Sequence, residues 1–267
     1  MGGAASSTNN FEPPIREKDD GKRTTEVHQF HAHGDTSIQA MYMNEMSTIE
    51  CILDMYLEWL KYERYRFVVL DLEYDFRQEK IAVMQIALRE HLPIFHLIRC
   101  QDNIYPLRQF LKNKDVTFVG VDIRTDHKLL YKQWLYIPPG KHLDLQDMLK
   151  IPGYGNRAGM ATMASELIHP KYAGMKEKFV HDYDKLEGHN FWEWKPLSDM
   201  NLEYASIDGY VTYELARIVT VVESIILHLG SPACKAKPIT AKKKCNSRTS
   251  MLLMSYSSES CTINIAD

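Results

Sequence analysis

The sequence contains little cysteine, no long hydrophobic run and no excess of positive charge. Its five cysteines are odd in number and form no Cys-x-x-Cys pair, which argues against a disulfide framework and a structural zinc site and favours an intracellular, reducing compartment. No apolar run approaches the ~18 residues of a membrane span, and the N-terminus lacks a hydrophobic signal core, so neither a stable membrane span nor secretion is expected. The net charge of −3 gives no whole-molecule basic field for nucleic acid.

The composition suits one globular domain with tails. The chain has 267 residues, of which 45% are hydrophobic and 10% aromatic, enough for a sizeable core. Residues 1–25 are rich in Ser, Asn, Pro and charge and are expected to be a flexible leader. We expect a single domain over residues 26–230, and a basic, largely disordered tail over residues 231–267. Cytoplasm and nucleus both remain open as the location.

The first residues also fit the form of an N-myristoylation signal. Met1 is followed by Gly2, and a Ser stands at position 6, as that signal requires. A single acyl chain would give only weak, reversible membrane binding. An ordinary Gly/Ala/Ser-rich disordered end explains the same residues equally simply, so both interpretations stay open.

The apolar pattern predicts an α/β fold, with a mixed sheet flanked by helices. A hairpin is expected from segments 27–33 and 36–42, and Ser47 is expected to cap the helix that follows and ends near Glu63. Further strands are expected at 67–73, 81–88, 93–98 and 116–121. Further helices are expected at 105–111, 125–134, 143–149, 160–168 and 202–229, and residues 170–196 have no regular period.

Two carboxylates stand at the end of a strongly apolar strand. Side chains at positions i and i+2 of a strand project from the same face, so Asp71 and Glu73 are expected to point into one cleft. Two buried anions need a cation, and a divalent metal is the usual one. Alternatively, the strand has already ended and both acids are solvated in a loop, which is common for short acidic motifs.

Further acids follow the later strand and lie on the last helix. Asp126 is expected in the first turn of a helix, where a capping role is the simple alternative, and Asp122 competes with it as a ligand. Tyr204 and Asp208 are four residues apart on one helix face, either as site residues or as a half-buried hydrogen-bonded pair.

Asp71, Glu73, Asp126, Tyr204 and Asp208, in that order, resemble the motifs of the DEDD superfamily of 3′-to-5′ exonucleases. The tyrosine points to the subclass that includes ribonuclease D and the Werner-syndrome exonuclease domain. The likeness covers about residues 26–228. It extends to segments 83–86, 119–121 and 194–197 beside the acids.

The resemblance implies a ribonuclease H-like fold and a metal-dependent 3′-to-5′ exonuclease with a two-metal-ion mechanism. Asp71 would bridge two cations, Glu73 and Asp208 would complete the first, and Asp126 would hold the second. Tyr204 would orient the attacking water. Two divalent cations stabilise the attacking and leaving oxygens of a phosphodiester, and oxygen ligands favour Mg²⁺ or Mn²⁺. A catalytically silent nucleic-acid-binding relative and a structural metal site remain as alternatives.

Substrate contacts are less clearly marked. Tyr74 and Phe76 follow the first two acids and are candidates for stacking on a terminal base. Arg124 and Lys128 are candidates for phosphate contacts, although a solvated helix face explains them equally well. We expect a preference for short or single-stranded 3′ ends, with DNA and RNA both open. The chain also resembles small plant Werner-like exonucleases and RISC-interacting clearing exoribonucleases, which implies a possible homo-oligomer.

The sequence departs from the resembled pattern at one position close to the third acid. Asp122 stands where a small residue is common in the family, so it could alter the electrostatics near Asp126. Its effect on activity is an open question at the level of sequence.

Overall fold

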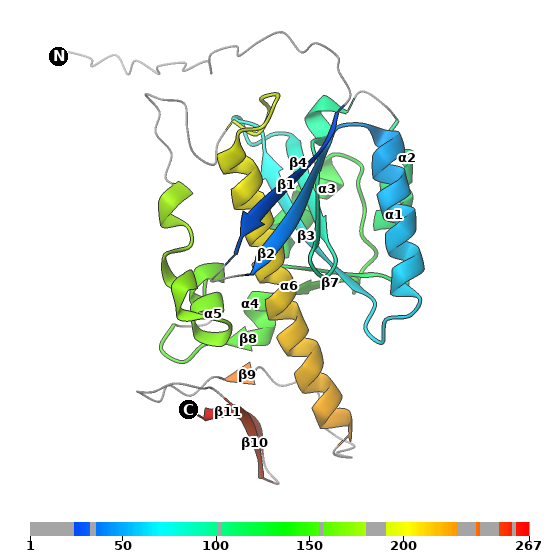
Figure 1. Ribbon diagram of the computed structural model, residues 1–267. Coiled ribbons are helices and arrows are strands. Elements are labelled where there is room, and N and C mark those ends of the chain that lie inside the picture. The colour runs from blue at the N-terminus through cyan, green and yellow to red at the C-terminus, as the bar shows by residue number, and fades with distance from the viewer. Residues whose placement is uncertain are drawn as a thin grey trace, which may run out of the picture.

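In the computed structural model, a seven-stranded mixed sheet forms the centre of the chain (Figure 1). The structure describes residues 24–32, 36–100, 103–154, 157–179, 191–228, 239–240, 251–257 and 260–266. The strands are β1 (Thr25–His31), β2 (Ser37–Met43), β3 (Phe67–Tyr74), β4 (Ile81–Ala87), β5 (His91–Phe95), β6 (Thr117–Gly120) and β7 (His142–Asp144). Their order across the sheet is β1-β2-β5-β4-β3-β6-β7.

Strand β3 lies in the interior of this sheet, between β4 and β6. It pairs antiparallel with β4 on one side and parallel with β6 on the other. The pairs β1–β2 and β4–β5 are antiparallel, whereas β2–β5 and β6–β7 are parallel. Because β3 has partners on both edges and helices over both faces, its apolar residues Phe67–Leu70 are buried. This mixed sheet confirms the expected fold class.

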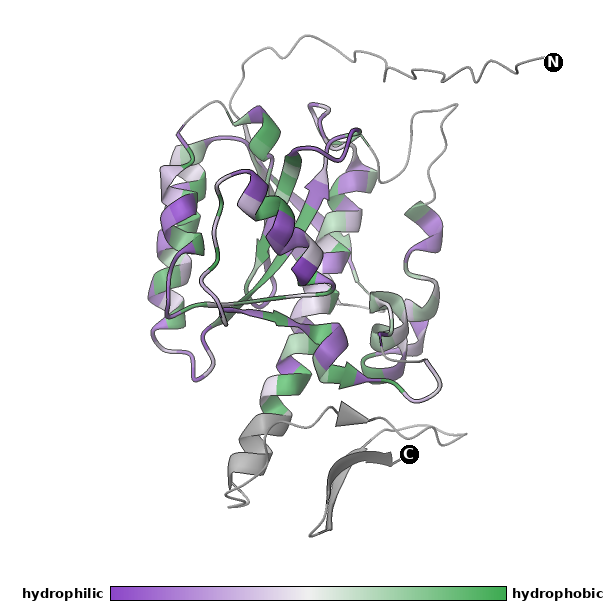
Figure 2. Ribbon diagram, turned by 180° about the vertical axis from the view of Figure 1, so that it is seen from behind, coloured by the Kyte–Doolittle hydropathy of each residue, from purple (hydrophilic) through white to green (hydrophobic). Residues whose placement is uncertain are grey.

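Helices cover both faces of the sheet (Figures 1 and 2). The core on one face contains residues of α1 (Met46–Leu60), α2 (Tyr105–Leu111) and α3 (Ile123–Lys132). The core on the other face contains residues of α4 (Leu145–Met148), α5 (Met160–Leu167) and α6 (Asp199–His228). The expected hairpin, the helix at 105–111 and the long last helix are confirmed. No helix in the described ranges is long and apolar enough to cross a membrane.

Several expected element boundaries are wrong. Ser47 does not cap α1, which begins at Met46 with Glu45 as its N-cap. The strand expected at 93–98 is β5, at His91–Phe95, and a 3-10 turn (Leu97–Arg99) follows it. The helix expected at 143–149 is shortened to α4, at Leu145–Met148, because its first residues belong to β7. β6 recruits residues 142–144 as an additional parallel strand, so sheet pairing overrides the helical pattern there.

The described parts of the irregular segment 170–196, residues 170–179 and 191–196, pack against the core, as expected. They form two 3-10 turns, η2 (Pro170–Gly174) and η3 (Glu177–Phe179), which bury Tyr172 and Phe179. The buried Trp192 and Trp194 then lead into α6, whose first turn is capped by the hydroxyl of Ser198, which accepts the Asn201 N–H at 3.1 Å.

Strands also occur in the tail. β8 (Leu149–Lys150) pairs with β9 (Ile239–Thr240), and β10 (Met251–Ser257) pairs antiparallel with β11 (Ser260–Ala266). The sequence predicts disorder here, but the alternation of polar and apolar residues at 262–265 suits a strand. Residues 1–23, with the myristoylation pattern, lie outside the described residues. The domain boundaries stay predictions.

Candidate active site

The interior strand β3 carries the first two acids in its C-terminal half. Asp71 pairs in register with Gln85 of β4, and Glu73 pairs with Val83. Both carboxylates are half-buried rather than fully solvated, and the strand continues to Tyr74. The alternative in which the strand has ended and both acids lie in a loop is therefore wrong.

A glycine lets β6 approach β3 next to these acids. A Cβ built on Gly120 would lie 2.7 Å from the backbone oxygen of Leu70, a distance that real Cβ atoms do not reach. Only glycine therefore fits at the end of β6 without moving the backbone that precedes Asp71. This close approach positions the turn from which α3 and Asp126 follow.

The long helix α6 supplies the tyrosine and the last acid. Tyr204 and Asp208 lie one turn apart, and Asp208 is 4% exposed. The Tyr204 ring contacts Phe179 and Trp192 edge-on, with ring centroids 5.2 Å and 6.0 Å apart. Burial, followed by the charges of Asp208 and Glu73, raises the pKa of Tyr204, so its hydroxyl stays protonated at neutral pH.

Asp71, Glu73 and Asp208 come together although they lie up to 137 positions apart in sequence. One carboxylate oxygen from each of them lies within 4.8 Å of the others. Burial raises the pKa of Asp71 well above its usual range, and the charges of Asp126 and Asp208 raise it further. Burial and the charge of Asp71 likewise raise the pKa of Glu73. The cluster therefore lacks enough positive charge for all its members to ionise.

The donor set fits a divalent cation. Carboxylate oxygens are hard ligands, which Mg²⁺ and Mn²⁺ prefer. Gln85, paired with Asp71 in the sheet, is 2% exposed, and its amide has no hydrogen-bond partner among the described residues. An unsatisfied buried amide beside three crowded acids is the arrangement expected where a hydrated ion belongs.

Lys176 was not predicted from the sequence and lies inside this cluster. Its ammonium contacts a carboxylate oxygen of Asp208, donates to the Tyr204 hydroxyl at 2.7 Å, and lies 4.0 Å from the centroid of the Tyr204 ring. It comes from the turn between η2 and η3. No periodicity marks that segment, so only its lysine-rich composition could have drawn attention to it.

Asp126 lies in the first turn of α3, close enough to Asp71 to raise the pKa of that acid. The Tyr74 hydroxyl donates a hydrogen bond to Asp126. Burial raises the pKa of Asp126 to about 7, and the charges of Asp122 and Asp144 add to this, while the Tyr74 hydrogen bond opposes it. Asp126 is 8% exposed and is not one of the three acids that converge within 4.8 Å.

The competing acid, Asp122, faces away from the carboxylate cluster into a network of its own. Asp122 is exposed and has a left-handed backbone (φ 60°) at the N-cap of α3. It accepts a hydrogen bond from Arg157 at 3.0 Å, and Arg157 also donates to Asp144 at 2.7 Å. These contacts engage the Asp122 carboxylate outside the cluster, and its influence reaches Asp126 through charge alone.

The remaining expected substrate residues differ in how available their side chains are to contact a substrate. The Arg124 guanidinium pairs with Asp147 at 2.8 Å, whereas Lys128 is exposed on α3. Phe76 is 39% exposed and its ring stacks parallel to Phe191, with centroids 6.4 Å apart. The substrate roles of Tyr74, Phe76, Arg124 and Lys128 stay predictions.

The mixed sheet and its converging acids define the class of 3′-5′ exonuclease domains. Residues 52–221 match the family model described as 3′-5′ exonuclease. The chain therefore belongs to this 3′-5′ exonuclease family, as the order of the acids predicts.

Solved structures share the fold. RNase D from Escherichia coli, an exoribonuclease involved in structured RNA processing, has a TM-score of 0.52 and 16% identity, over 67% of this chain and 44% of that one. A variant of the catalytic core of RRP6 from Trypanosoma brucei has a TM-score of 0.51 and 18% identity, over 70% and 48%. RNase D of the same organism with GMP has a TM-score of 0.51 and 16% identity, over 71% and 62%. The chain thus spans less than half of the first two structures, and no curated protein matches its sequence.

Proposed function

We propose that this chain hydrolyses nucleic acid from the 3′ end as a metal-dependent exonuclease of the tyrosine subclass. The observation that carries the proposal is the convergence of Asp71, Glu73 and Asp208 beside the Tyr204 hydroxyl, in a chain of the 3′-5′ exonuclease family. Nucleases need a site that neutralises charge and orients water, and this cluster has the residue types for both tasks.

Asp71, Glu73 and Asp208 would hold one divalent cation, and Asp71 with Asp126 a second. Such cations, Mg²⁺ or Mn²⁺, neutralise charge on the attacking and leaving oxygens of a phosphodiester and lower the pKa of water. The raised pKa values of Asp71 and Glu73 support this assignment, because nearby positive charge would return both groups to their ionised form.

Tyr204 would position the attacking water through its hydroxyl. Its raised pKa keeps the phenol protonated, so it acts as a hydrogen-bonding group that orients water and not as the general base. The Lys176 ammonium, which already contacts Tyr204 and Asp208, would hold the tyrosine in place and lie close to the phosphate being cleaved. Tyr74 would fix the orientation of Asp126 through its hydrogen bond.

The test is digestion of end-labelled oligonucleotides. Single-stranded RNA, single-stranded DNA and a primed duplex are incubated with Mg²⁺ or Mn²⁺, and parallel samples contain EDTA. A ladder of products shortened from the 3′ end, absent in EDTA, is the expected result, and the three substrates compared side by side report the preferred polymer.

A matched pair of variants tests the site assignment. Tyr204→Phe removes only the hydroxyl and is expected to slow hydrolysis by about 10²-fold, the scale of a lost positioning group. Tyr213→Phe, which is on the same helix and packs against Phe67, should hydrolyse at the rate of the unsubstituted protein. Absence of a ladder with every polymer and metal would favour the catalytically silent relative. Full activity of Tyr204→Phe would show that the tyrosine is assigned wrongly.

A homo-oligomer, which the resemblance to ring-forming exonucleases implies, is a further part of the proposal. Light scattering of the full-length protein would measure its size.

A further inference from the structure

The C-terminal end of α3 has an unusual residue in its capping turn. The Leu135 N–H donates to the Leu130 oxygen at 2.9 Å, and the Trp134 N–H donates to the Tyr131 oxygen at 3.1 Å. These two bonds form a Schellman motif, in which Leu135 packs back on Leu130 inside the core. In this motif the residue directly after the C-cap has a left-handed backbone, and glycine is strongly preferred there. Here it is Trp134, with φ of 62°.

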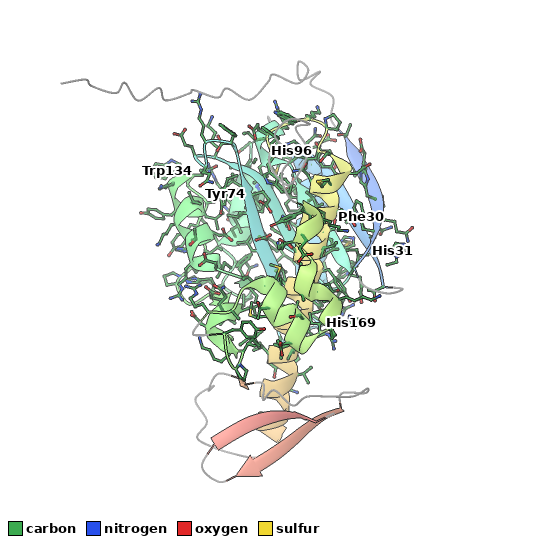
Figure 3. The ribbon with its side chains drawn as sticks, turned by 90° about the vertical axis from the view of Figure 1, so that its left-hand side faces the viewer. Phe30, His31, Tyr74, His96, Trp134 and His169 are labelled. Atoms are coloured by element: carbon green, nitrogen blue, oxygen red, sulfur yellow. The ribbon has the colours of Figure 1, made fainter. Side chains whose placement is uncertain are left out.

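Trp134 is unfavourable at this position for two separate reasons. A bulky residue with positive φ is strained by its Cβ, and strain of this kind is concentrated at functional sites. In addition, its large apolar side chain is 82% exposed, and it lies at the periphery of the molecule in Figure 3. A glycine would relieve the backbone strain and expose no indole. Folding therefore does not account for the tryptophan, which points to a role outside the core.

Trp134 lines a surface hollow of about 830 Å³ that combines aromatic rings with lysines. We call it the basic-aromatic hollow and define it by Lys112, Lys114, Tyr131, Lys132, Trp134 and Tyr136. The exposed fractions of Tyr131 and Tyr136 are 69% and 36%. No acid lines the hollow, and within the described part of the chain none of its lysines has a carboxylate at ion-pair distance.

We propose that the basic-aromatic hollow binds the body of a single-stranded nucleic acid whose 3′ end lies in the carboxylate cluster. Uncompensated lysines attract phosphates, and exposed aromatic rings stack on bases of any sequence. The same helix joins both places: Asp126 is in its first turn, and Lys132 is six residues further, about 9 Å along the axis. The inference rests on the proposed exonuclease function and adds a second contact region for longer substrates.

Charge favours this occupant over a second copy of the chain. The molecule carries a net charge of −3, and its carboxylate cluster is acidic, so a positive surface without acids is the place where a polyanion gains most. A second copy of the chain would need a surface that is both acidic and apolar to pair with these lysines and aromatic rings. Self-association is therefore kept as an outcome of the test.

The test compares a long and a minimal substrate with the full-length protein. The first measurement is the affinity for a fluorescent single strand of about 20 nucleotides, longer than one binding groove, by anisotropy in EDTA, where no hydrolysis occurs. RNA and DNA strands are measured separately. The second is the rate at which a dinucleotide is hydrolysed with Mn²⁺. A dinucleotide is too short to contact both the carboxylate cluster and the basic-aromatic hollow.

Trp134→Gly is the first variant. We expect about tenfold weaker binding of the long strand, equivalent to about 1.4 kcal/mol, and dinucleotide hydrolysis within about twofold of the unsubstituted rate. The melting temperature should stay the same or rise, because glycine relieves the left-handed strain. Weaker binding in a protein that is no less stable excludes a merely structural role for the tryptophan.

Substitution of Lys112, Lys114 and Lys132 by Gln is the second variant. For a single strand, each lost phosphate contact lowers the slope of log affinity against log salt by about 0.7, so we expect a decrease of about two for the three. The matched control is Lys61→Gln with Tyr62→Ala, a lysine and an 88% exposed aromatic ring outside the hollow, which should bind as the unsubstituted protein does.

Three results would overturn the proposal. The first is unchanged affinity and salt slope in both hollow variants, or no binding of a long strand at all. The second is an equal loss for dinucleotide and long strand, which would show that Trp134 acts through α3 on Asp126. The third is dissociation of an oligomer on size exclusion with unchanged affinity per chain. If the protein hydrolyses nothing yet binds strands through Trp134, the exonuclease proposal fails and the hollow remains a binding site.

Discussion

The two ends of α3 meet opposite physical demands. Its first turn holds Asp126, an acidic side chain that is 8% exposed and accepts a hydrogen bond from Tyr74. Its last turn holds Lys132 and leads to Trp134, 82% exposed in a strained backbone conformation. An acidic side chain is buried at one end, whereas the other end exposes positive charge and apolar surface. The comparison shows how one rigid element can place a reaction site and a binding surface in a fixed relation.

Asp71→Asn should have the largest effect at the buried end. The amide keeps the shape of the side chain but removes a charged ligand, and several kcal/mol of lost charge stabilisation corresponds to about 10³-fold slower hydrolysis or more. In EDTA the variant should melt at a higher temperature, because one member of a crowded acid cluster is gone. Single-turnover hydrolysis and thermal melting in EDTA and Mg²⁺ measure both effects.

The basic-aromatic hollow provides the contrast for this variant. Asp71→Asn should bind the long single strand in EDTA at least as tightly as the unsubstituted protein, since the hollow is unchanged and an anion has been removed. Asp75→Asn serves as the matched control and should retain the hydrolysis rate, since this half-buried acid only accepts the backbone N–H groups of Glu79 and Lys80 in the turn after β3. Strong loss of strand binding by Asp71→Asn would contradict the separation of the two regions.

Lys176→Met should have the next largest effect. The substitution keeps the length of the side chain but removes the ammonium that contacts Asp208 and Tyr204, so we expect hydrolysis to slow by about 10- to 10²-fold. Without metal the melting temperature should fall, because Lys176 is a cation close to three acids. Saturating Mg²⁺ should largely restore it, since ligand binding stabilises the folded state. Calorimetric melting with and without Mg²⁺ measures this difference.

Two comparisons keep the Lys176 prediction specific. Lys178→Met, which loses an exposed pair with Glu203, should affect neither the rate nor the metal-free melting temperature. Lys176→Arg should recover part of the metal-free stability. An unchanged melting temperature of Lys176→Met in EDTA would mean that the ammonium does not compensate the cluster.

The sequence indicated which acids and which tyrosine lie together in the carboxylate cluster, but it indicated neither Lys176 nor the position of Trp134. Asp71 and Glu73 alternate along an apolar strand, and Tyr204 and Asp208 are one helical turn apart, so local periodicity shows which side chains share a face. Lys176 lies between two 3-10 turns in a segment without any period, and its place depends on how that segment packs on α6. The role of Trp134 could not be predicted for another reason. It depends on a left-handed φ, which a sequence indicates only where the residue is glycine.

The stability of the metal-free protein should depend on pH with a defined sign. The pKa of Asp126 is about 7 in the folded chain and about 3.9 in an unfolded one, so the folded state holds the proton more tightly. Its contribution is therefore complete below about pH 4 and is lost as the pH rises through about 7, at up to about 1.4 kcal/mol per pH unit. The raised pKa values of Asp71 and Glu73 act in the same direction.

Denaturant unfolding between about pH 5 and pH 8 measures this dependence. In EDTA the free energy of unfolding should fall with increasing pH, and in saturating Mg²⁺ the fall should shrink, because cations favour the ionised acids. Asp126→Asn should flatten part of the EDTA profile. A flat profile for the unsubstituted protein in EDTA would contradict the raised pKa values, and the hollow variant Trp134→Gly should follow the unsubstituted profile.

Asp122→Gly should have the smallest effect, because Asp122 acts on the buried end only through charge. Glycine fits its left-handed φ of 60° without strain, while the exposed pair with Arg157 is worth about 0–1 kcal/mol, so the two changes in stability nearly cancel. Loss of the Asp122 charge should lower the pKa of Asp126 and move the acid limb of the pH–rate profile to lower pH, with the maximal rate within about twofold. Asp147→Gly, which removes an exposed acid paired with Arg124, is the matched control and should leave the acid limb in place. A fall of tenfold or more in the maximal rate for Asp122→Gly alone would place Asp122 among the residues that hold the cation. The reaction site would then include the N-cap of α3 as well as its first turn.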